Sequence, residues 1–190
     1  AAVKAYASGS KGLVNGTPSY SSPDRTANQI KATVKLVPIE KSSLALDLGA
    51  MADAAKGAGL VFVCNPNNPT GSIVGHDAVD RFMARVPDDV LVVFDEAYRE
   101  FVTTADFPDG VDLLREHRNV AVLRTFSKAY GLAALRVGYA IARPEVIEVL
   151  RKVRVPFTTN ELAQVAAVAS LAAQDEMLVR VAEVVSERER

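Results

Sequence analysis

The chain has 190 residues, of which 49% are hydrophobic and 24% charged, a composition typical of one globular domain rather than of a disordered or fibrous protein. A formal net charge of −1 favours neither a nucleic-acid partner nor a membrane surface. No apolar run reaches the roughly 18 residues of a membrane-spanning helix, and the first residues lack the apolar core of a signal peptide.

The first 30 residues carry a weak pattern, in which glycines and serines indicate loops around a short extended piece. Residues 26–32 are predicted to form a helix. Residues 33–39 alternate as a strand does, with Pro38 marking its end or an edge position. Residues 49–56 are predicted to be helical, and the glycines that follow would end this helix.

Three short apolar runs, residues 60–64, 90–94 and 120–123, dominate the middle of the chain. They are continuous rather than alternating, which is typical of strands buried on both faces. Predicted helices at 76–85 and 111–116 separate them. Because the runs begin about 30 residues apart, the rhythm of strand–helix–strand units, we expect an α/β fold with a mostly parallel, mixed sheet flanked by helices.

The last third of the chain is predicted to be largely helical. An extended piece at 137–142 precedes a helix that begins at Pro144 and runs to about residue 153. An alanine-rich helix follows at 161–173, and a further helix runs from 175 to the end of the chain. Because this pattern continues to the last residue without a terminator, we expect the sequence to be a piece of a longer protein.

Cysteine and histidine are scarce. Cys64 is the single cysteine, which excludes an internal disulfide and fits a reducing compartment, so we expect a cytoplasmic protein. His76 and His117 are the only histidines, and with one cysteine they make a structural zinc site unexpected.

A polar cluster follows each of the three apolar runs directly, at residues 65–71, 95–98 and 125–128. The carboxyl ends of parallel strands meet at one edge of a sheet, and ligands of such sheets bind outside that edge. We therefore expect the three clusters to form one site.

The first two clusters contain an amide, a carboxylate and a phenol. Asn68 lies in a proline-rich turn that would aim its amide at a phenolate oxygen, although asparagine and proline are also common in ordinary turns. Asp95 ends a buried strand and needs a cationic partner such as a protonated pyridine nitrogen; an N-cap or a structural salt bridge is the alternative. Tyr98 can reach the same phenolate oxygen, and Glu96 is predicted to be supporting or solvent-facing.

The third cluster contains Lys128 beside small hydroxyl residues, a place suited to an amine that forms a Schiff base with a carbonyl cofactor, although a surface lysine at a strand end is the alternative. Thr125 and Ser127 can donate hydroxyl groups to a phosphate, and Arg136 can bind it with a two-pronged contact. Tyr20 is a candidate to stack on the cofactor ring, with a partly buried core tyrosine as the alternative.

Three segments carry a resemblance to a known family: NPNNPTG at 65–71, DEAY at 95–98 and TFSKAYGLAALRVG at 125–138. In order, spacing and strand-end placement they resemble the signature segments of the class I/II pyridoxal-phosphate-dependent aminotransferases. The longer string around Lys128 is most similar to the histidinol-phosphate aminotransferase branch and to relatives that act on aromatic amino acids. The resemblance runs from about residue 16 to the end of the chain.

The resemblance implies that residues 1–190 form the pyridoxal-phosphate-binding large domain of a fold-type I enzyme, with the N-terminal arm and the C-terminal small domain largely missing. Lys128 would form the Schiff base and later move the substrate proton, Asp95 would pair with the pyridine nitrogen, and Asn68 and Tyr98 would bind the ring's 3-oxygen. The phosphate and the ring face would be bound by the remaining candidates, Thr125, Ser127, Arg136 and Tyr20. No residue matches the arginine with which the family grips its substrate.

The implied reaction moves an amino group from an amino acid to a keto acceptor, foremost from histidinol phosphate to 2-oxoglutarate in histidine biosynthesis. The implied enzyme is a homodimer that acts on small molecules, with no nucleic acid or membrane partner. The alternatives are an aromatic amino acid aminotransferase, a lyase, decarboxylase or acyltransferase of the same fold, or a cofactor-binding regulatory module. A dinucleotide-binding fold is disfavoured because no Gly-x-Gly-x-x-Gly follows a predicted strand.

Overall fold

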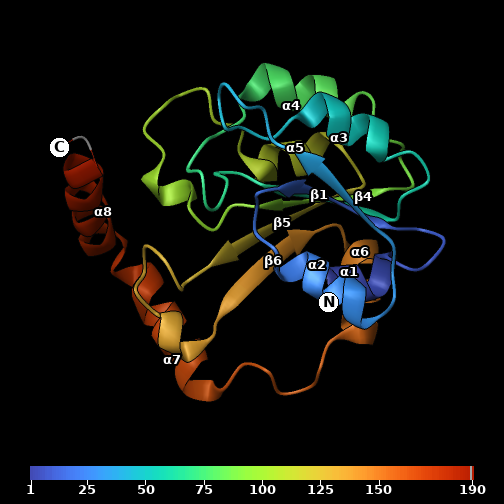
Figure 1. The fold of residues 1–190 in the computed structure, drawn as a ribbon. Coiled ribbons are helices and arrows are strands. Elements are labelled where there is room, and N and C mark those ends of the chain that lie inside the picture. Colours follow the sequence, from blue (N-terminus) through green and yellow to red (C-terminus); the bar gives the residue numbers. More distant parts are fainter. Residues whose placement is uncertain (189) are drawn as a thin grey trace.

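A six-stranded sheet of order β2-β1-β3-β4-β5-β6 forms the centre of the protein in a computed structural model that describes residues 1–188 and 190 (Figure 1). The strands β1 to β5 run parallel, and β6 runs antiparallel to β5. This arrangement confirms the mostly parallel, mixed sheet expected from the spacing of the apolar runs. The strands are β1 Leu13–Thr17, β2 Val34–Pro38, β3 Leu60–Cys64, β4 Leu91–Asp95, β5 Val120–Thr125 and β6 Gly138–Ala142.

Helices cover both faces of the sheet, as Figure 1 shows. The helices α3 (Leu48–Ala54), α4 (His76–Met83) and α5 (Gly110–Glu116) contribute buried side chains to the core on one face. The helices on the other face are α1 (Ala2–Tyr6), α2 (Ser22–Gln29) and α6 (Pro144–Val153).

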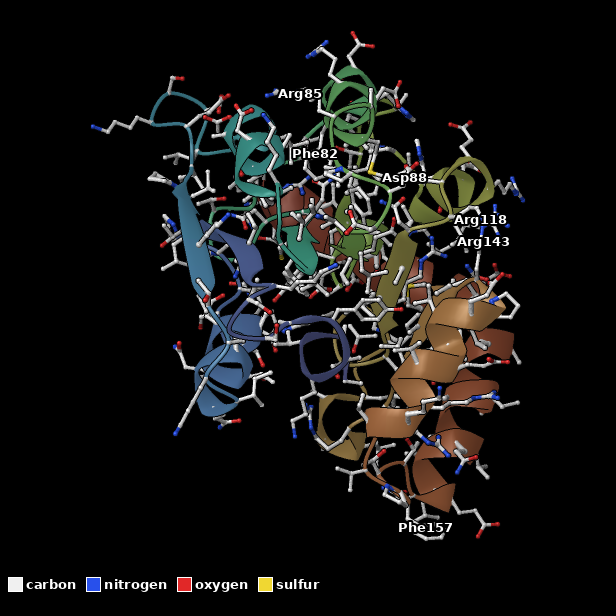
Figure 2. The ribbon with its side chains drawn as sticks, turned by 90° about the vertical axis from the view of Figure 1, so that its right-hand side faces the viewer. Phe82, Arg85, Asp88, Arg118, Arg143 and Phe157 are labelled. Carbon is white, nitrogen blue, oxygen red and sulfur yellow. The ribbon has the colours of Figure 1, made fainter. Side chains whose placement is uncertain are left out.

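The core of each face follows from the period of two along a strand. In β3, Val61 and Val63 belong to the core under α3 and α4, while Leu60 and Phe62 belong to the core under α1 and α2. Phe82, labelled in Figure 2, is 1% exposed and extends from α4 into the first of these cores. A strand buried on both sides has no polar face, which explains why the apolar runs are continuous.

Two further helices, α7 (Glu161–Ala172) and α8 (Gln174–Arg188), lie beside the layers rather than on them (Figure 1). They pack small and apolar side chains against residues 126–137, the loop between β5 and β6. Phe157, in the segment before α7, is fully exposed at the outer end of the molecule (Figure 2). Within the described residues no single helix is long and apolar enough to cross a membrane, and α7 and α8 meet at an angle of 80°.

The elements predicted after residue 33 are confirmed, with each end within two residues of the prediction, except that residue 189 of the last predicted helix lies outside the described residues. The prediction of a helix at 26–32 is wrong in its bounds, because α2 begins at Ser22 with Pro23 in its first turn and ends before Lys31, whose φ is +57°. The reading of residues 1–30 as mostly loops missed α1 and placed β1 poorly. The polar Asn15 interrupts the apolar pattern of β1, although this strand lies between β2 and β3.

Candidate active site

The parallel strands bring the three predicted polar clusters to one edge of the sheet. In register, Cys64 of β3 pairs with Asp95 of β4, and Asp95 pairs with Leu123 of β5. The backbone ladder extends one step further, since Asn65 N donates to Asp95 O over 3.0 Å and Glu96 N donates to Leu123 O over 2.9 Å. The segments that follow these strands therefore begin side by side.

Lys128, Tyr98 and Asn68 meet at this edge, although about 30 residues separate each from the next in sequence. The Nδ2 atom of Asn68 donates to the hydroxyl of Tyr98 over 3.2 Å. The Lys128 Nζ atom lies 5.0 Å from the centroid of the Tyr98 ring, within the range of a cation–π contact. The amine, the phenol and the amide assigned to one site are thus in contact.

Asp95 ends β4 next to this group. Burial raises its pKa to about 6, the charge of Glu96 adds to this rise, and the Ala97 amide and the Lys128 amine oppose it. Its Oδ1 atom accepts a hydrogen bond from Ala97 N over 3.1 Å, and among the described residues it forms no ion pair. The described contacts therefore do not support the alternative that Asp95 forms a structural salt bridge. A buried carboxylate without an ion-pair partner is costly, and a cation beside Asp95 would offset that cost.

Cys64 lies directly below the site at the end of β3. Its thiol is 2% exposed and donates to Pro66 O over 3.4 Å. Burial, followed by the negative charge of Asp95, raises the pKa of this thiol to about 12. The neutral side chain therefore belongs to the core and has no nucleophilic role.

The hydroxyl residues after β5 form a tight turn. Ser127 N donates to Thr125 Oγ1 over 3.1 Å, which leaves the Thr125 hydroxyl proton available to donate to a ligand. Thr125 pairs with Gly138 of β6, two residues after Arg136, so the pairing brings Arg136 near the turn. Arg136 has a left-handed backbone with φ of +55°, and its exposed guanidinium donates to Ala133 O over 2.7 Å. The structure therefore places Arg136 near Thr125 and Ser127, but the described hydrogen bond of its guanidinium group is to Ala133 in its own turn.

Tyr20 follows β1 at the same edge. It is 41% exposed, and its ring centroid lies 6.4 Å from that of Phe62 at an interplanar angle of 35°. Asn15 fixes the turn behind it, because its fully buried Nδ2 atom donates to Tyr20 O over 3.1 Å and to Asp24 Oδ1 over 2.8 Å. The ring is thus on the surface of the site rather than in the core.

Asn67 joins the loop of Tyr20 to the loop of Asn68, a role that the sequence analysis missed. Its Oδ1 atom accepts from Ser19 Oγ over 2.7 Å, and its Nδ2 atom donates to Pro18 O over 3.2 Å. It is 4% exposed. In an asparagine-rich turn the sequence offers no signal that separates this structural amide from its neighbour, since either could face the ligand.

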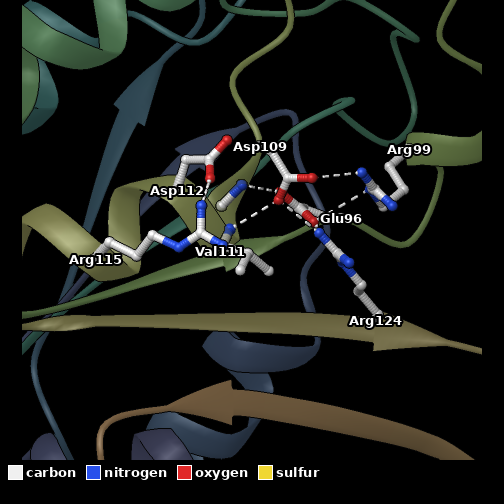
Figure 3. Close-up of polar contacts among 8 residues, drawn as sticks. Glu96, Arg99, Asp109, Val111, Asp112, Arg115 and Arg124 are labelled. Carbon is white, nitrogen blue, oxygen red and sulfur yellow. Dashed lines mark hydrogen bonds and ion pairs between the residues drawn. The ribbon is translucent and has the colours of Figure 1, made fainter.

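An ion-pair network around the buried Glu96 lies on the other side of the β4 end (Figure 3). Glu96 is 2% exposed and accepts from Arg124 Nε over 2.8 Å and from Gly110 N over 2.6 Å. Asp109 accepts from Arg124 Nη2 over 2.8 Å and from Arg99 Nη2 over 2.7 Å. Of the two expectations for Glu96, the solvent-facing one is wrong, because the side chain is buried and its ion-pair partners are Arg99 and Arg124. Two features of the sequence could have indicated this network: Glu96 follows an apolar run, and Arg124 lies at the end of a predicted strand.

A cavity of about 550 Å³ adjoins the site on the side of Asn68 and Tyr98. Phe101, Val184 and Arg188 contribute to its far wall, and Arg188 Nη1 donates to Phe101 O over 3.1 Å. Lys128 and Asp95 are outside its lining. The cavity therefore borders the reactive groups and does not contain them.

The donor set suits an organic anion with an amine-reactive carbonyl. Among residues 1–188 and 190, no three histidine, cysteine, aspartate or glutamate side chains converge as metal ligands. Lys128 supplies an amine, Asp95 a carboxylate whose pKa is raised by burial, and Thr125 and Ser127 supply hydroxyl groups. An aldehyde, a protonated ring nitrogen and a phosphate are the complementary groups, and pyridoxal phosphate combines all three.

This fold and this set of groups define a pyridoxal-phosphate-binding α/β domain, and comparison with known proteins gives the family. A family model described as "Aminotransferase class I and II" matches residues 2–190. The chain belongs to this family, whose cofactor is pyridoxal phosphate. The match confirms the resemblance found in the three motifs.

Individual relatives agree with the family but differ in name. The chain is 60% identical over 145 residues to the aromatic amino acid aminotransferase of Streptomyces coelicolor, covering 76% of this chain and 40% of the relative. It is 55% identical over 162 residues to that of Nocardia farcinica, covering 84% and 45%. The crystal structure of histidinol-phosphate aminotransferase from Sinorhizobium meliloti, in complex with pyridoxal-5'-phosphate, matches with a TM-score of 0.90 at 30% identity, covering 98% of this chain and 50% of that one. The chain thus spans half or less of the length of these relatives.

Proposed function

We propose that residues 1–190 form the cofactor-binding large domain of a pyridoxal-phosphate-dependent aminotransferase, active in the cytoplasm as a homodimer on small amino and keto acids. The observation that carries the proposal is the meeting of the Lys128 amine, the Tyr98 phenol and the Asn68 amide beside Asp95. These groups come from separate segments of the chain and meet at the carboxyl edge of the sheet, where sheets of this kind bind their ligands. The family match supports the same conclusion.

Each group has a role in holding the cofactor. Lys128 would hold it through Nζ, Asp95 would pair with the ring nitrogen, and Asn68 and Tyr98 would bind the ring oxygen. Hydroxyl and guanidinium groups would bind the phosphate, and one aromatic ring would pack on the cofactor face. The residues in these last two roles are Thr125, Ser127, Arg136 and Tyr20.

The bound cofactor supplies an aldehyde that combines with amines and a ring that withdraws electrons. The chain supplies proton transfer and charge. The Lys128 Nζ atom takes a proton from the amino-acid donor and later returns one, and its position over the Tyr98 ring keeps it at the site. Asp95 becomes a stable carboxylate once a cation lies beside it, because the burial that now raises its pKa strengthens the attraction.

For the donor, we place aromatic amino acids first. The two curated relatives above carry that name at 55% and 60% identity, whereas the histidinol-phosphate enzyme is 30% identical. Histidinol phosphate, the first choice from the sequence motifs, remains the second candidate, supported by the high structural similarity of that enzyme. A shared fold does not fix the substrate, so the order rests on the higher identity.

A panel of donors tests the proposal. The full-length protein is loaded with pyridoxal phosphate and mixed with phenylalanine, tyrosine, histidinol phosphate or glutamate, while the cofactor absorbance and the keto products are measured. The expected result is fastest conversion of the aromatic donors, with 2-oxoglutarate as acceptor. Faster conversion of histidinol phosphate would reverse the order of the candidates. A decarboxylated or eliminated product in place of a keto acid would contradict the transaminase assignment, and Lys128→Ala serves as the inactive control.

A further inference from the structure

Two consecutive carboxylates at the end of β4 have opposite surroundings. Asp95 accepts one described hydrogen bond and lacks an ion pair among the described residues. Glu96 uses both oxygens: Oε1 accepts from Gly110 N, and Oε2 accepts from Arg124 Nε and lies 3.5 Å from Arg99 Nε. Figure 3 shows Glu96 between the two arginines. A buried carboxylate with this many partners is fixed in one orientation.

The Glu96–Arg124 contact lies where the backbone ladder between β4 and β5 ends, beside its final hydrogen bond from Glu96 N to Leu123 O over 2.9 Å. The last register pair between these strands is Asp95 with Leu123. Beyond it, β5 continues by pairing with β6, since Arg124 is opposite Tyr139. The side-chain pair therefore bridges the two strand ends one residue after Asp95 and four residues before Lys128.

An outer layer fixes this bridge. Asp109 holds Arg124 and Arg99 with its two oxygens, and it also caps α5 by accepting from Val111 N over 2.8 Å. Burial raises the pKa of Asp109, but the Val111 amide and the two guanidinium groups lower it by more than burial raises it. The pKa is therefore below its usual value, and the carboxyl group stays ionised at neutral pH. The arginines and acids balance in charge, which reduces the cost of burying them.

Gly110 lets the helix approach the bridge. A Cβ atom at this position would lie 2.7 Å from Glu96 Oε1 and 2.8 Å from Val122 Cγ2. Because only a glycine leaves this space open, the α5 N-terminus can donate its first amide to Glu96. The bridge is thus bonded to β4, to β5 and to α5.

We propose that Glu96 and Arg124 are positioning residues that fix Asp95 relative to Lys128. This inference rests on the proposed function, because it concerns the two groups that would hold the cofactor ring at its nitrogen and at its aldehyde. The described side-chain contacts of the pair include neither Asp95 nor Lys128, so it would act through the strand ends that carry Asp95 and the Lys128 turn. Loss of the pair would let the ends of β4 and β5 move apart, while Asp95 kept its carboxylate and Lys128 kept its amine.

Electrostatics alone gives the opposite expectation. The charge of Glu96 raises the pKa of Asp95, so removing that charge makes the Asp95 carboxylate easier to ionise. If Glu96 acted only through its charge, a neutral variant would bind the cofactor as well or better and lose no rate. The direction of the effect therefore separates positioning from charge.

Glu96→Gln tests the proposal in the full-length holoenzyme. The amide has nearly the shape of the carboxylate, but one of its ends must turn an N–H group toward Arg124 or Gly110, both of which donate. We expect cofactor to remain attached to Lys128, kcat to fall about 10- to 100-fold, KM to change less, and the visible circular dichroism of the bound cofactor to change. The dichroism reports the orientation of the cofactor, which a merely stabilising network would not alter.

Asp112→Asn is the matched control, because Asp112 forms an exposed ion pair with Arg115 on α5 and loses the same charge. It should leave kcat and dichroism unchanged. Asp109→Asn is a milder second variant that keeps an acceptor for Val111 N but weakens the hold on both arginines, and it should lower kcat by less than Glu96→Gln.

Unchanged kcat and dichroism in folded Glu96→Gln would overturn the positioning role while the wild type still transaminates. Should Glu96→Gln fail to fold, the same readouts in Asp109→Asn decide the question, and unchanged values there would overturn the role. A wild-type protein that binds no cofactor would instead overturn the proposed function.

Discussion

The end of β4 separates two polar regions of unlike character. On one side, the network of Glu96, Arg99, Asp109 and Arg124 pairs each charge with an opposite one inside the fold. On the other side, Asp95 is buried with a raised pKa and, among the described residues, without an ion pair. The two regions are one residue apart along the chain.

The difference teaches where a ligand belongs. A charged group that has an opposite charge within the protein can stabilise the fold. A buried charged group without such a partner costs folding free energy, and groups of this kind are typical of sites where a ligand supplies the opposite charge. Lys128 is exposed and so does not carry the cost of burial, but its described contact is likewise with the Tyr98 ring rather than with a carboxylate. The contrast can be sharpened by changing one group on each side.

The largest effect is expected from Lys128→Ala. This change removes the amine that attaches the cofactor and moves the substrate proton, so the rate of transamination should fall by roughly 1,000-fold or more. The fold should persist because Lys128 is exposed. Steady-state rates and far-UV circular dichroism measure both expectations. The exposed Lys56 offers a control, since Lys56→Ala should keep full activity; equal activity of the two variants would remove Lys128 from the mechanism.

Asp95→Asn should separate function from stability. Without a carboxylate to pair with the ring nitrogen, the variant should retain cofactor but lose about 100-fold or more in rate. Full activity would remove Asp95 from the mechanism. The exposed Asp53→Asn change is a control of equal charge and should be close to neutral.

The same variant should stabilise the cofactor-free protein at pH 7. Because the pKa of Asp95 rises from 3.8 to about 6 on folding, its ionisation weakens the folded state as the pH increases through this range. The asparagine has no such cost, so the free energy of unfolding should increase by roughly 1–3 kcal/mol at pH 7 and by little below pH 3.8. Urea denaturation at several pH values measures this. A gain that does not change with pH would contradict the assigned cause.

An effect of similar size and opposite sign is expected from Gly110→Ala, next to the network of Glu96, Arg99, Asp109 and Arg124. The added methyl group would press on Glu96 and Val122 and should lower the free energy of unfolding by about 1–3 kcal/mol, more than the modest gain from removing a helical glycine. Gly9→Ala is the control, because its nearest contact would be an ordinary 3.9 Å. Thermal denaturation of both variants makes the comparison. An undamaged Gly110→Ala protein would show that the network tolerates displacement of α5.

The fold could be predicted where the apolar pattern is simple. The runs that became β3, β4 and β5 are buried on both faces, so their continuity reports their environment directly. The strand β1 was expected only as a short extended piece without bounds, because Asn15 is buried in it, and its side chain is satisfied by Tyr20 and Asp24, contacts that no local pattern reveals. Tertiary hydrogen bonds outweighed local propensity there.

The candidate site shows the same limit. Residues that follow strand ends could be placed together, because parallel topology alone brings Asn68, Tyr98 and Lys128 to one edge. The partners of Glu96 could not be foreseen. They come from β5 and from the start of α5, and which of two adjacent acids faces the network depends on side-chain directions that only the folded chain defines.

The measurement that tests the account most directly is borohydride reduction of the full-length protein with pyridoxal phosphate, followed by mass mapping of its peptides. We predict an absorbance band that reduction removes and a cofactor mass on the peptide that contains Lys128. A folded protein with no adduct, or an adduct on another lysine, would contradict the claim that the region of Asp95 and Lys128 is a cofactor site.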